Sequence, residues 1–389
     1  MTRCAPLRTR VRQMGVKVET TCGVEQSLTA ADYKVRATEL SADLAVAPIE
    51  NATLSAFLSP KAMSAGEQTM SGKVSACLVG SGAAATKPEI DQLLQISSMT
   101  PTAVMKIAIG AVTNGPFVRG EVVSQAVSLA TGKVMLPCTN GDGFIYVIVT
   151  SGTFNATGAI TGGTSTASAT ASALAVAAGW RYAPDTSNRS TGTVVFNEDG
   201  YKKTIIGAMA DWSISADSSG IAKIDFTISG AKGTHADAAM VTGIVPYTTA
   251  FPVFRDALFA INRGIIGEFT PIIANVGVSL GNSVSMRKDA NSTTGLVASI
   301  STARKPKITF APEAVLAADF DLLGKMSSAA TMSVGFRFHA ADNDVWVFAQ
   351  ECQIETANEG DREGTQTADV TMNAYSTLGD GEIELVFIN

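Results

Sequence analysis

The residues that most often carry out catalysis are few in this chain and lie far apart. Its two histidines are His235 and His339. His235 lies in Gly233–Asp237, which has the composition of a loop, and His339 follows Arg337 on the polar side of an alternating segment. Neither has a cysteine near it in sequence, so a Cys–His nucleophile would need a pairing that only the fold could create. We expect both histidines to be non-catalytic, His339 as an exposed strand residue.

The motifs of common enzyme classes are also missing. The chain has no G-x-S-x-G, no G-x-x-x-x-G-K-[ST] and no H-E-x-x-H. Thr131-Gly132-Lys133 is similar to the end of a phosphate-binding loop, but Val127 stands where the first glycine is required. We therefore predict no catalytic residue, no cofactor-binding residue and no metal-binding residue, and we expect that the protein is not an enzyme.

Clustered carboxylates are the remaining candidates for chemistry. Asp342-Asn343-Asp344 and Asp361-Arg362-Glu363 could bind a hard cation through oxygen atoms, but neither has the spacing of an EF-hand loop. Short acidic runs of this kind are more typical of turns. Glu382 and Glu384 share one face of a strand, where we expect them to face solvent or a basic partner and not to form an acid/base pair.

The cysteines and the N-terminus bear on where the protein is made. The number of cysteines is odd and none forms a C-x-x-C pair, which favours reduced thiols in a cytosolic product; they are Cys4, Cys22, Cys77, Cys138 and Cys352. Met1–Glu19 is basic and has no apolar core, so we do not expect a signal peptide. Its basic residues are expected to be solvated or to pair with acids on a neighbouring molecule. No uncharged segment is apolar enough to predict a membrane span.

The composition favours association with other subunits. Charged residues make up only 16% of the 389 residues and hydrophobic ones 46%, which suits a chain that buries much surface against its neighbours. The net charge is −6, which argues against a dedicated nucleic-acid-binding protein.

The elements that position these residues are predicted to be mainly β-strands. Trp212, Ile214 and Ala216 alternate with polar residues, Asp217–Gly220 predicts a turn, and a returning strand carries Ala222, Ile224, Phe226 and Ile228 on one face. Met332, Val334, Phe336 and Phe338 alternate in the same way. Trp346–Glu355 is apolar on both faces near Phe348, as expected if one face meets a neighbouring subunit.

Only two helices are predicted. Pro88–Met99 and Pro312–Met326 each begin with proline, and each has apolar residues at helical spacing. In the second segment these are Val315, Leu316, Phe320 and Leu323. Both apolar faces are expected to pack on the core.

Two segments differ in composition from the rest. Residues 101–178 contain predicted strands at Thr102–Val112, Gly120–Leu136 and Phe144–Val149, followed by a stretch of Gly, Ala, Ser and Thr. We interpret 101–178 as a small β module inserted into a domain formed by 1–100 and 179–389, and we expect it on the outer surface; a low-complexity linker is the alternative for its second half. Asn51–Lys73 has few bulky apolar residues and is expected to be a long loop or an extended hairpin.

The last forty residues alternate in two runs. Ala368, Val370, Met372 and Ala374 alternate in Thr367–Ser376, and Ile383, Leu385 and Phe387 alternate in Glu382–Asn389. The Gly/Asp turn between the runs predicts a C-terminal β-hairpin with those residues facing the core and Glu384 on the opposite face. Because the sequence stops there, we expect the last strand to belong to the fold and not to a frayed tail.

Several of these segments resemble, in the same order, the tail tube proteins (major tail proteins) of long, non-contractile-tailed bacteriophages. The similar segments are Gly15–Gly23, Thr29–Asp32, Pro88–Leu94, Gly207–Gly230, Gly360–Gly364 and Gly379–Glu382. The resemblance implies a β-sandwich or barrel with one or two short helices, which closes into hexameric rings that stack into a tube. It also implies that Asn51–Lys73 reaches from one ring to the next.

The function that this resemblance implies is structural. The protein would be made in the cytoplasm of the host bacterium and reside in the tail of the virion, where the tube is the conduit for the genome. Its partners would be further copies of itself, the tape measure protein, the tail terminator and the distal tail or baseplate proteins. DNA would pass through the lumen without specific binding, and no membrane would be involved. Two alternatives remain: another phage structural protein, for head decoration or head–tail joining, or a β-rich glycan hydrolase of the virion surface.

Overall fold

A computed structural model describes residues 7–54, 57, 59, 61–218, 220–262, 268–341 and 343–389. A few residues named above lie outside these ranges. They are Met1, Cys4 and Asp342, and parts of the ranges Met1–Glu19, Asn51–Lys73 and Asp217–Gly220 also lie outside.

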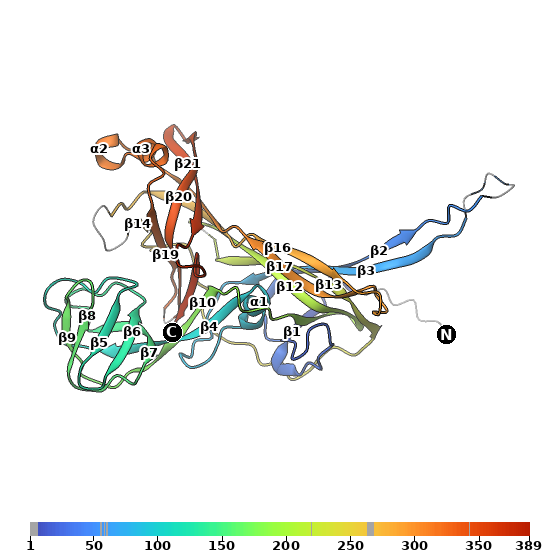
Figure 1. The fold of residues 1–389 in the computed structure, drawn as a ribbon, viewed down its shortest axis with the longest axis horizontal. Coiled ribbons are helices and arrows are strands. Elements are labelled where there is room, and N and C mark those ends of the chain that lie inside the picture. The colour runs from blue at the N-terminus through green and yellow to red at the C-terminus, as the bar shows by residue number, and fades with distance from the viewer. Residues whose placement is uncertain are drawn as a thin grey trace.

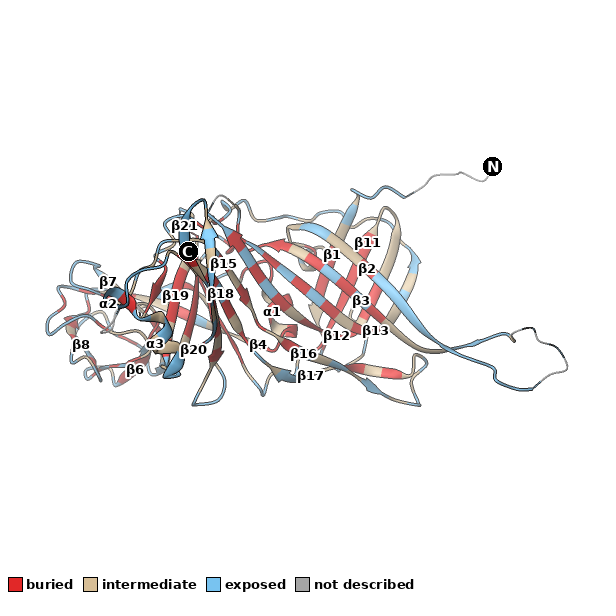
Figure 2. Cartoon of the chain, turned by 90° about the horizontal axis from the view of Figure 1, so that it is seen from above, coloured by how far each residue is buried: buried red, intermediate tan, exposed pale blue. Residues whose placement is uncertain are grey.

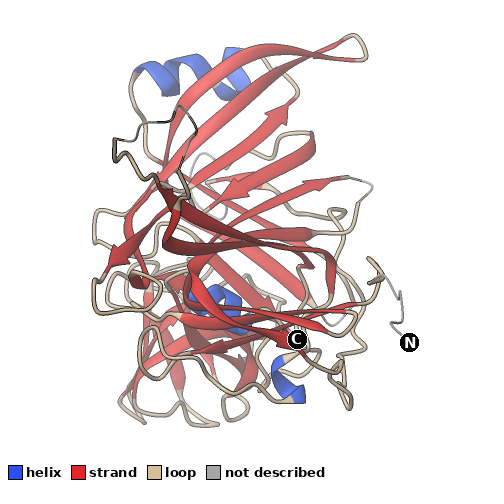
Figure 3. Ribbon diagram, turned by 90° about the vertical axis from the view of Figure 1, so that its right-hand side faces the viewer, coloured by secondary structure: helices blue, strands red, loops and turns tan. Residues whose placement is uncertain are grey.

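The fold is mainly β, as predicted from the alternating segments. Strands hold 53% of the residues and helices 5% (Figure 3). The helices are short: a 3-10 turn η1 (Ala30–Asp32), α1 (Asp91–Ile96), α2 (Ala317–Phe320) and α3 (Leu322–Ser327).

The strands fall into two groups along the chain, with further strands between them. The first unit contains β1 (Arg12–Val18), β2 (Ala37–Ile49), β3 (Ser64–Cys77), β11 (Gly192–Glu198), β12 (Tyr201–Asp217) and β13 (Lys223–Asp237). The second unit contains β14 (Ala260–Ile261), β15 (Ile273–Ser279), β16 (Asn282–Lys288), β17 (Leu296–Arg304), β18 (Lys307–Pro312), β19 (Met332–Phe338), β20 (Asp344–Arg362), β21 (Thr365–Tyr375) and β22 (Glu384–Ile388). Between β3 and β11 lie β4 (Met99–Ala108), β5 (Val122–Gln125), β6 (Ala130–Val134), β7 (Phe144–Ser151), β8 (Ala159–Gly162), β9 (Ser168–Thr170) and β10 (Val176–Pro184).

The two units repeat one pattern of antiparallel pairing. In the first unit β1 pairs with β11, β11 with β12, β12 with β13, β13 with β3, and β3 with β2. In the second unit β14 pairs with β19, β19 with β20, β20 with β21, β21 with β18, and β18 with β15. The strands also follow one another along the chain in corresponding order, and each unit places its short helix after β3 or after β18. The chain therefore contains one structural unit twice.

The two units are joined into one sheet where the end of β12 pairs with β15. Ser213–Asp217, at the end of β12, pairs with Asn275–Ser279 of β15. The strands β2, β3, β13, β12, β15, β18, β21 and β20 are consequently neighbours in that order. One face of this sheet packs on the main hydrophobic core, which extends through both units.

The central strands confirm the alternation expected from the sequence. Trp212, Ile214, Phe226 and Ile228 are each about 1% exposed or less, and Lys223 on the opposite face is exposed. Met332, Val334, Phe336 and Phe338 are likewise buried along β19. Figure 2 shows the alternation as red and pale bands across β12, β13 and β3.

The predicted helices were too long. Helix α1 spans only Asp91–Ile96, and Met99 already begins β4. The segment Pro312–Met326 is divided at Asp321, whose side chain accepts a hydrogen bond from the Gly324 N–H and starts α3 anew. As a result Phe320 alone of the predicted apolar face is buried. The other members, which were wrongly expected in the core, are exposed: Val315 46%, Leu316 76% and Leu323 63%.

The predicted C-terminal hairpin is wrong. Strands β21 and β22 do not pair with each other. Both pair with the long strand β20, β21 with Glu351–Arg362 and β22 with Asp344–Phe348, and they run in the same direction. Residues 376–383 therefore form a loop that connects β21 to β22, and these two strands lie end to end along β20. Strand β22 pairs on its other edge with β10, and both of its faces are buried, one on the main core and the other in a cluster with Trp346 and Phe348.

Residues 101–178 have a hydrophobic core of their own. It includes Ile107, Phe117, Ile145, Phe154 and Ile160. Strands β8 and β9 lie in the Gly/Ala/Ser/Thr stretch, so the second half is an ordered part of this module and not a linker. Figure 1 shows the module, β5 to β9, at the opposite end of the molecule from the tip of β2 and β3.

A third hydrophobic cluster ties this module to the main sheet. Val104 and Met135 pack there with Trp346, Phe348 and Val386. The apolar outer face of β20 therefore meets the module, and not a neighbouring subunit as the sequence led us to expect.

This contact changes the expected result of excising the module. The sequence alone suggests that joining Thr100 to Gly179 would leave assembly-competent protein. In the structure that deletion uncovers Trp346 and Phe348, so we expect mostly insoluble chain. The soluble fraction after expression is the measurement. Soluble deletion protein that unfolds at the temperature of the full chain would show that the third cluster is dispensable.

Candidate assembly surfaces

The residues that sequence reasoning considered for catalysis are scattered. His235 lies near the end of β13, not in a loop, and its Nδ1 is 3.0 Å from the Gly233 carbonyl oxygen. His339 lies just after β19, and its Nδ1 is 2.6 Å from a carboxylate oxygen of Asp344, which also pairs with Arg337. This is an ion cluster at the end of a strand, about 41% exposed at the histidine. Among the described residues no three His, Cys, Asp or Glu side chains form a group that could hold a metal ion.

None of the cysteines in the described part of the chain forms a disulfide bond. Cys22 is exposed, and Cys77, Cys138 and Cys352 are buried. Burial raises the pKa of Cys138 and of Cys352 to about 12, so these thiols stay protonated at neutral pH.

The described residues of the two short acidic runs, Asp342–Asp344 and Asp361–Glu363, form turns, hydrogen bonds or ion pairs. Glu363 and Gly364 have φ values of 54° and 87° and form the two-residue turn between β20 and β21. Arg362 beside them pairs with Glu313. Asn343 is buried and accepts a hydrogen bond from the Gly80 N–H at 2.9 Å.

The two carboxylates near the C-terminus bind separate arginines. Glu382 lies 2.9 Å from Arg304, which also pairs with Asp380. Glu384 pairs with Arg119 and Arg181. A basic partner was one of the two expectations for these residues. The arrangement does not present a free pair of carboxylates of the kind that glycoside hydrolysis needs.

Glu384 is a buried charged group held between two arginines. It was expected on an outward face, but only 4% of it is exposed, because β10 and β20 flank β22 and the module covers it. Burial by itself would raise the pKa of Glu384. The guanidinium groups of Arg119 and Arg181 outweigh that effect and hold the pKa below its ordinary value.

Arg119 brings the module into this ion pair. Its guanidinium carbon lies 3.9 Å from the centre of the Phe348 ring, and Arg181 comes from β10. The cluster thus links the module, β10, β20 and the last strand. Sequence reasoning missed both arginines as partners of Glu384, because each lies more than two hundred residues away from it along the chain.

The first candidate assembly surface is an arm made by β2 and β3. Beyond the last pairing of β3 with β13, at Thr69, the segments Val46–Ile49 and Ser64–Gln68 are each other's strand partners, and the Gln68 N–H also donates to the Thr294 carbonyl oxygen at 3.1 Å. Residues 64–73 of the predicted segment Asn51–Lys73 thus form one strand of an extended hairpin whose other strand ends at Ile49, and Figures 1 and 2 show the arm extending well beyond the rest of the fold. Several of its apolar side chains are exposed: Val46 41%, Ile49 57%, Leu54 99%, Phe57 79% and Met63 63%. Such residues on a projecting hairpin are typical of a contact surface.

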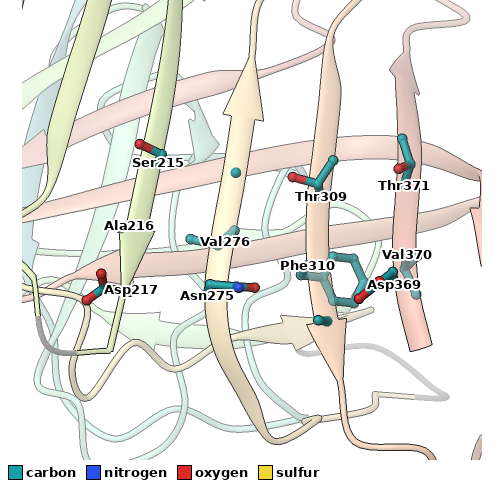
Figure 4. Close-up of a pocket in the computed structure, with 12 residues that line it drawn as sticks. Ser215, Ala216, Asp217, Asn275, Val276, Thr309, Phe310, Asp369, Val370 and Thr371 are labelled. Atoms are coloured by element: carbon teal, nitrogen blue, oxygen red, sulfur yellow. The ribbon is translucent and has the colours of Figure 1, made fainter. Parts of the chain in front are cut away.

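The second candidate surface is the polar face of the main sheet. Its residues are small and mostly uncharged or acidic, and the strand registers place them on one side: Glu39, Ser41, Lys73, Ser75, Ser213, Ser215, Asp217, Lys223, Asp225, Thr227, Asn275, Gly277, Thr309, Asp369 and Thr371. A shallow hollow of about 490 Å³ crosses β12, β15, β18 and β21 on this face. Figure 4 shows Ser215, Asn275, Thr309 and Thr371 along it.

The polar face carries no excess of positive charge. Its lysines are Lys73 and Lys223, and its carboxylates are Glu39, Asp217, Asp225 and Asp369. Lys307 and Glu355 lie at the border of this face. Lys307 is moreover paired with Glu355 at 2.6 Å. A surface of this charge offers few cations that could release counterions from a nucleic acid backbone.

No protein-family model and no curated protein sequence matches this chain. Within the described ranges, no helix combines the length and apolar character that crossing a membrane requires.

Proposed function

We propose that this protein is a structural subunit that polymerises, as stacked rings, into the tail tube of a long, non-contractile-tailed bacteriophage. The observation that carries the proposal is the continuous antiparallel sheet with a small-residue polar face of low charge. A wall built from such sheets would line a hollow that lets DNA pass without holding it. The ordered resemblance of both ends of the chain to tail tube proteins supports the same function.

The work of such a subunit is mechanical. Closing a ring would cover strand edges that otherwise favour aggregation. The arm would reach a subunit of the adjacent ring, and tape measure, terminator and distal tail proteins would bind at the ends of the tube. The subunit would be made in the host cytoplasm, would reside in the virion tail, and would have no enzymatic activity and no cofactor.

The number of chains in a ring depends on how the repeated unit is used. The resemblance implies six copies. Because each chain contains the unit twice, six chains would place twelve units around the ring, and three chains would place six. Rotational symmetry in end-on views separates these arrangements.

Self-association is the first test of this function. Light scattering of the purified protein at rising concentration is expected to give masses that grow in multiples of 40.2 kDa. A monodisperse monomer at the highest concentration, with no polymer after tail components are added, would contradict the proposal.

The arm offers a second test. Replacing Val46 and Ile49 by serine is expected to leave unfolding of the subunit within about 0.5 kcal/mol of the original, because both side chains are already exposed. We expect the same variant to form shorter tubes or separate rings. Val24→Ser, at a residue 51% exposed and outside both the arm and the pocket between α2 and α3, is the matched control. Tubes of unchanged length from the arm variant would exclude the arm from ring-to-ring contact.

A further inference from the structure

The repeated unit suggests how one copy joins the next. Inside the chain, the units meet where the end of β12, beyond the last residue paired with β11, pairs with β15, the second strand of the second unit. In the second unit β20 corresponds to β12, and in the first unit β2 corresponds to β15. The same kind of junction would therefore join β20 of one copy to β2 of another.

No further strand pairs with either of these edges in the described part of the chain, although the Leu40 and Ala42 carbonyl oxygens of β2 accept hydrogen bonds from the side chains of Arg12 and Lys203. Strand β2 pairs only with β3. Strand β20 pairs with β19 only as far as Cys352, so Thr356–Arg362 has β21 on one side and no strand on the other. Strand β12 is similar in this respect: the part of β12 that pairs with β15 is the part that extends beyond its pairing with β11.

The core of the second unit is also open at this edge. A pocket of about 280 Å³ lies between α2, α3 and the sheet, where Phe269, Phe310, Phe320 and Ala357 line it. At the internal junction the core continues without a break from Ile214 and Ala216 of β12 to Val278 and Val276 of β15. A second copy that joined β20 in the same way would cover the apolar pocket.

Charges of opposite sign lie near the two edges, although the β2 segment also carries the exposed carboxylates Glu39 and Asp43 on its polar face. Glu359 and Asp361 are exposed on the open part of β20. Arg10 and Arg12 line a hollow beside Ala37–Leu40 of β2, and an Arg12 guanidinium nitrogen lies 2.5 Å from the Leu40 carbonyl oxygen. Opposite charges of this kind favour the pairing of unlike edges and disfavour β20 with β20.

We propose that copies of this chain associate head to tail, with Thr356–Arg362 of β20 in one copy pairing with Ala37–Asp43 of β2 in the next. The contact is heterologous, because it joins two different edges, so it repeats from copy to copy. The copies form a closed ring when the rotation between neighbouring copies divides a full turn evenly. This assignment of edges rests on the proposed function, and its test separates the two.

Mixed single-cysteine variants test the pairing directly. In a background with Cys4→Ser and Cys22→Ser, one chain carries Asn358→Cys on the polar face of β20. A second chain carries Glu39→Cys, Ser41→Cys or Asp43→Cys on the same face of β2. Neighbouring strands bring Cα atoms to about 4.5–5.5 Å, within the range of a disulfide. Asp217→Cys with Asn275→Cys, partners across the internal junction, is the positive control within one chain.

We expect a cross-linked two-chain product only when Asn358→Cys is mixed with one of the β2 variants, and not from any variant alone. If the control forms its bond and tubes are present but no mixture cross-links, the edge assignment is wrong and the proposed function stands. If the unsubstituted protein forms neither rings nor tubes, both proposals fail.

A backbone variant supplies independent evidence. The two-residue turn after Arg362 makes Arg362 and Thr365 a hydrogen-bonded pair, so the main-chain N–H of Glu359 faces the open edge. Glu359→Pro removes that donor without removing a bond to β21. We expect at least a tenfold rise in the concentration needed for assembly, with Glu359→Ala as the control that removes the charge alone. Equal assembly of the proline and alanine variants would overturn strand pairing at this edge.

Discussion

Replacing Glu384 by alanine is expected to destabilise the isolated subunit by about 3–5 kcal/mol, because the change leaves buried guanidinium groups without a counter-charge. Arg119 is only 10% exposed and Arg181 21%, so neither can recover full hydration without opening the contact between the module and β22. This expectation reverses the one from the sequence, which placed Glu384 on an outward face and predicted almost no effect.

Urea denaturation of the Glu384→Ala variant gives the measurement, with Glu363→Ala in the exposed turn as the control. The control is expected to change the free energy of unfolding by less than about 0.5 kcal/mol. A loss below about 1 kcal/mol for Glu384→Ala would mean that water already reaches the arginines.

The effect of Glu384 should also depend on pH. Its pKa is lower in the folded chain than its ordinary value of about 4.3. The ionised group therefore stabilises the fold at pH values above that ordinary value, and the stabilisation is lost as the pH falls through the folded-state pKa. We expect the difference in unfolding temperature between the original protein and Glu384→Gln to be largest near neutral pH and to shrink below about pH 4.

The second large effect is expected at Phe387. Its ring is fully buried and meets Tyr182 edge-on, with ring centres 5.7 Å apart. Phe387→Ala removes buried apolar surface and leaves a cavity in a segment held between β10 and β20, so a loss of about 3–5 kcal/mol is expected. Leu378→Ala, at a residue 94% exposed, is the control. Calorimetric unfolding with no change for Phe387→Ala would contradict the packing of β22.

The sequence predicted best those strands that have one buried and one solvated face. Trp212 and Ile214 on β12 and Phe336 on β19 alternate with polar residues, so their burial follows from period-2 patterning alone. The same signal failed at β20 and β22, where the module covers the second face. Alternation cannot distinguish solvent from a distant part of the same chain.

The sequence also did not predict which distant segments pair with each other. The turn signals around Gly379 and Gly381 are real turn positions, with φ values of 106° and 94°, but the strands that flank them pair with β20 and not with each other. The partners of Glu384 come from Arg119 and Arg181, more than two hundred residues away in sequence. The repeated unit was hidden because the module interrupts the first copy and β16 and β17 interrupt the second.

The most direct test of the proposed function is electron microscopy of the purified full-length protein, alone and after addition of tail components. We predict rings or tubes with a central hole. Isolated globules, or filaments without a lumen, would contradict the proposal that this chain builds a conduit.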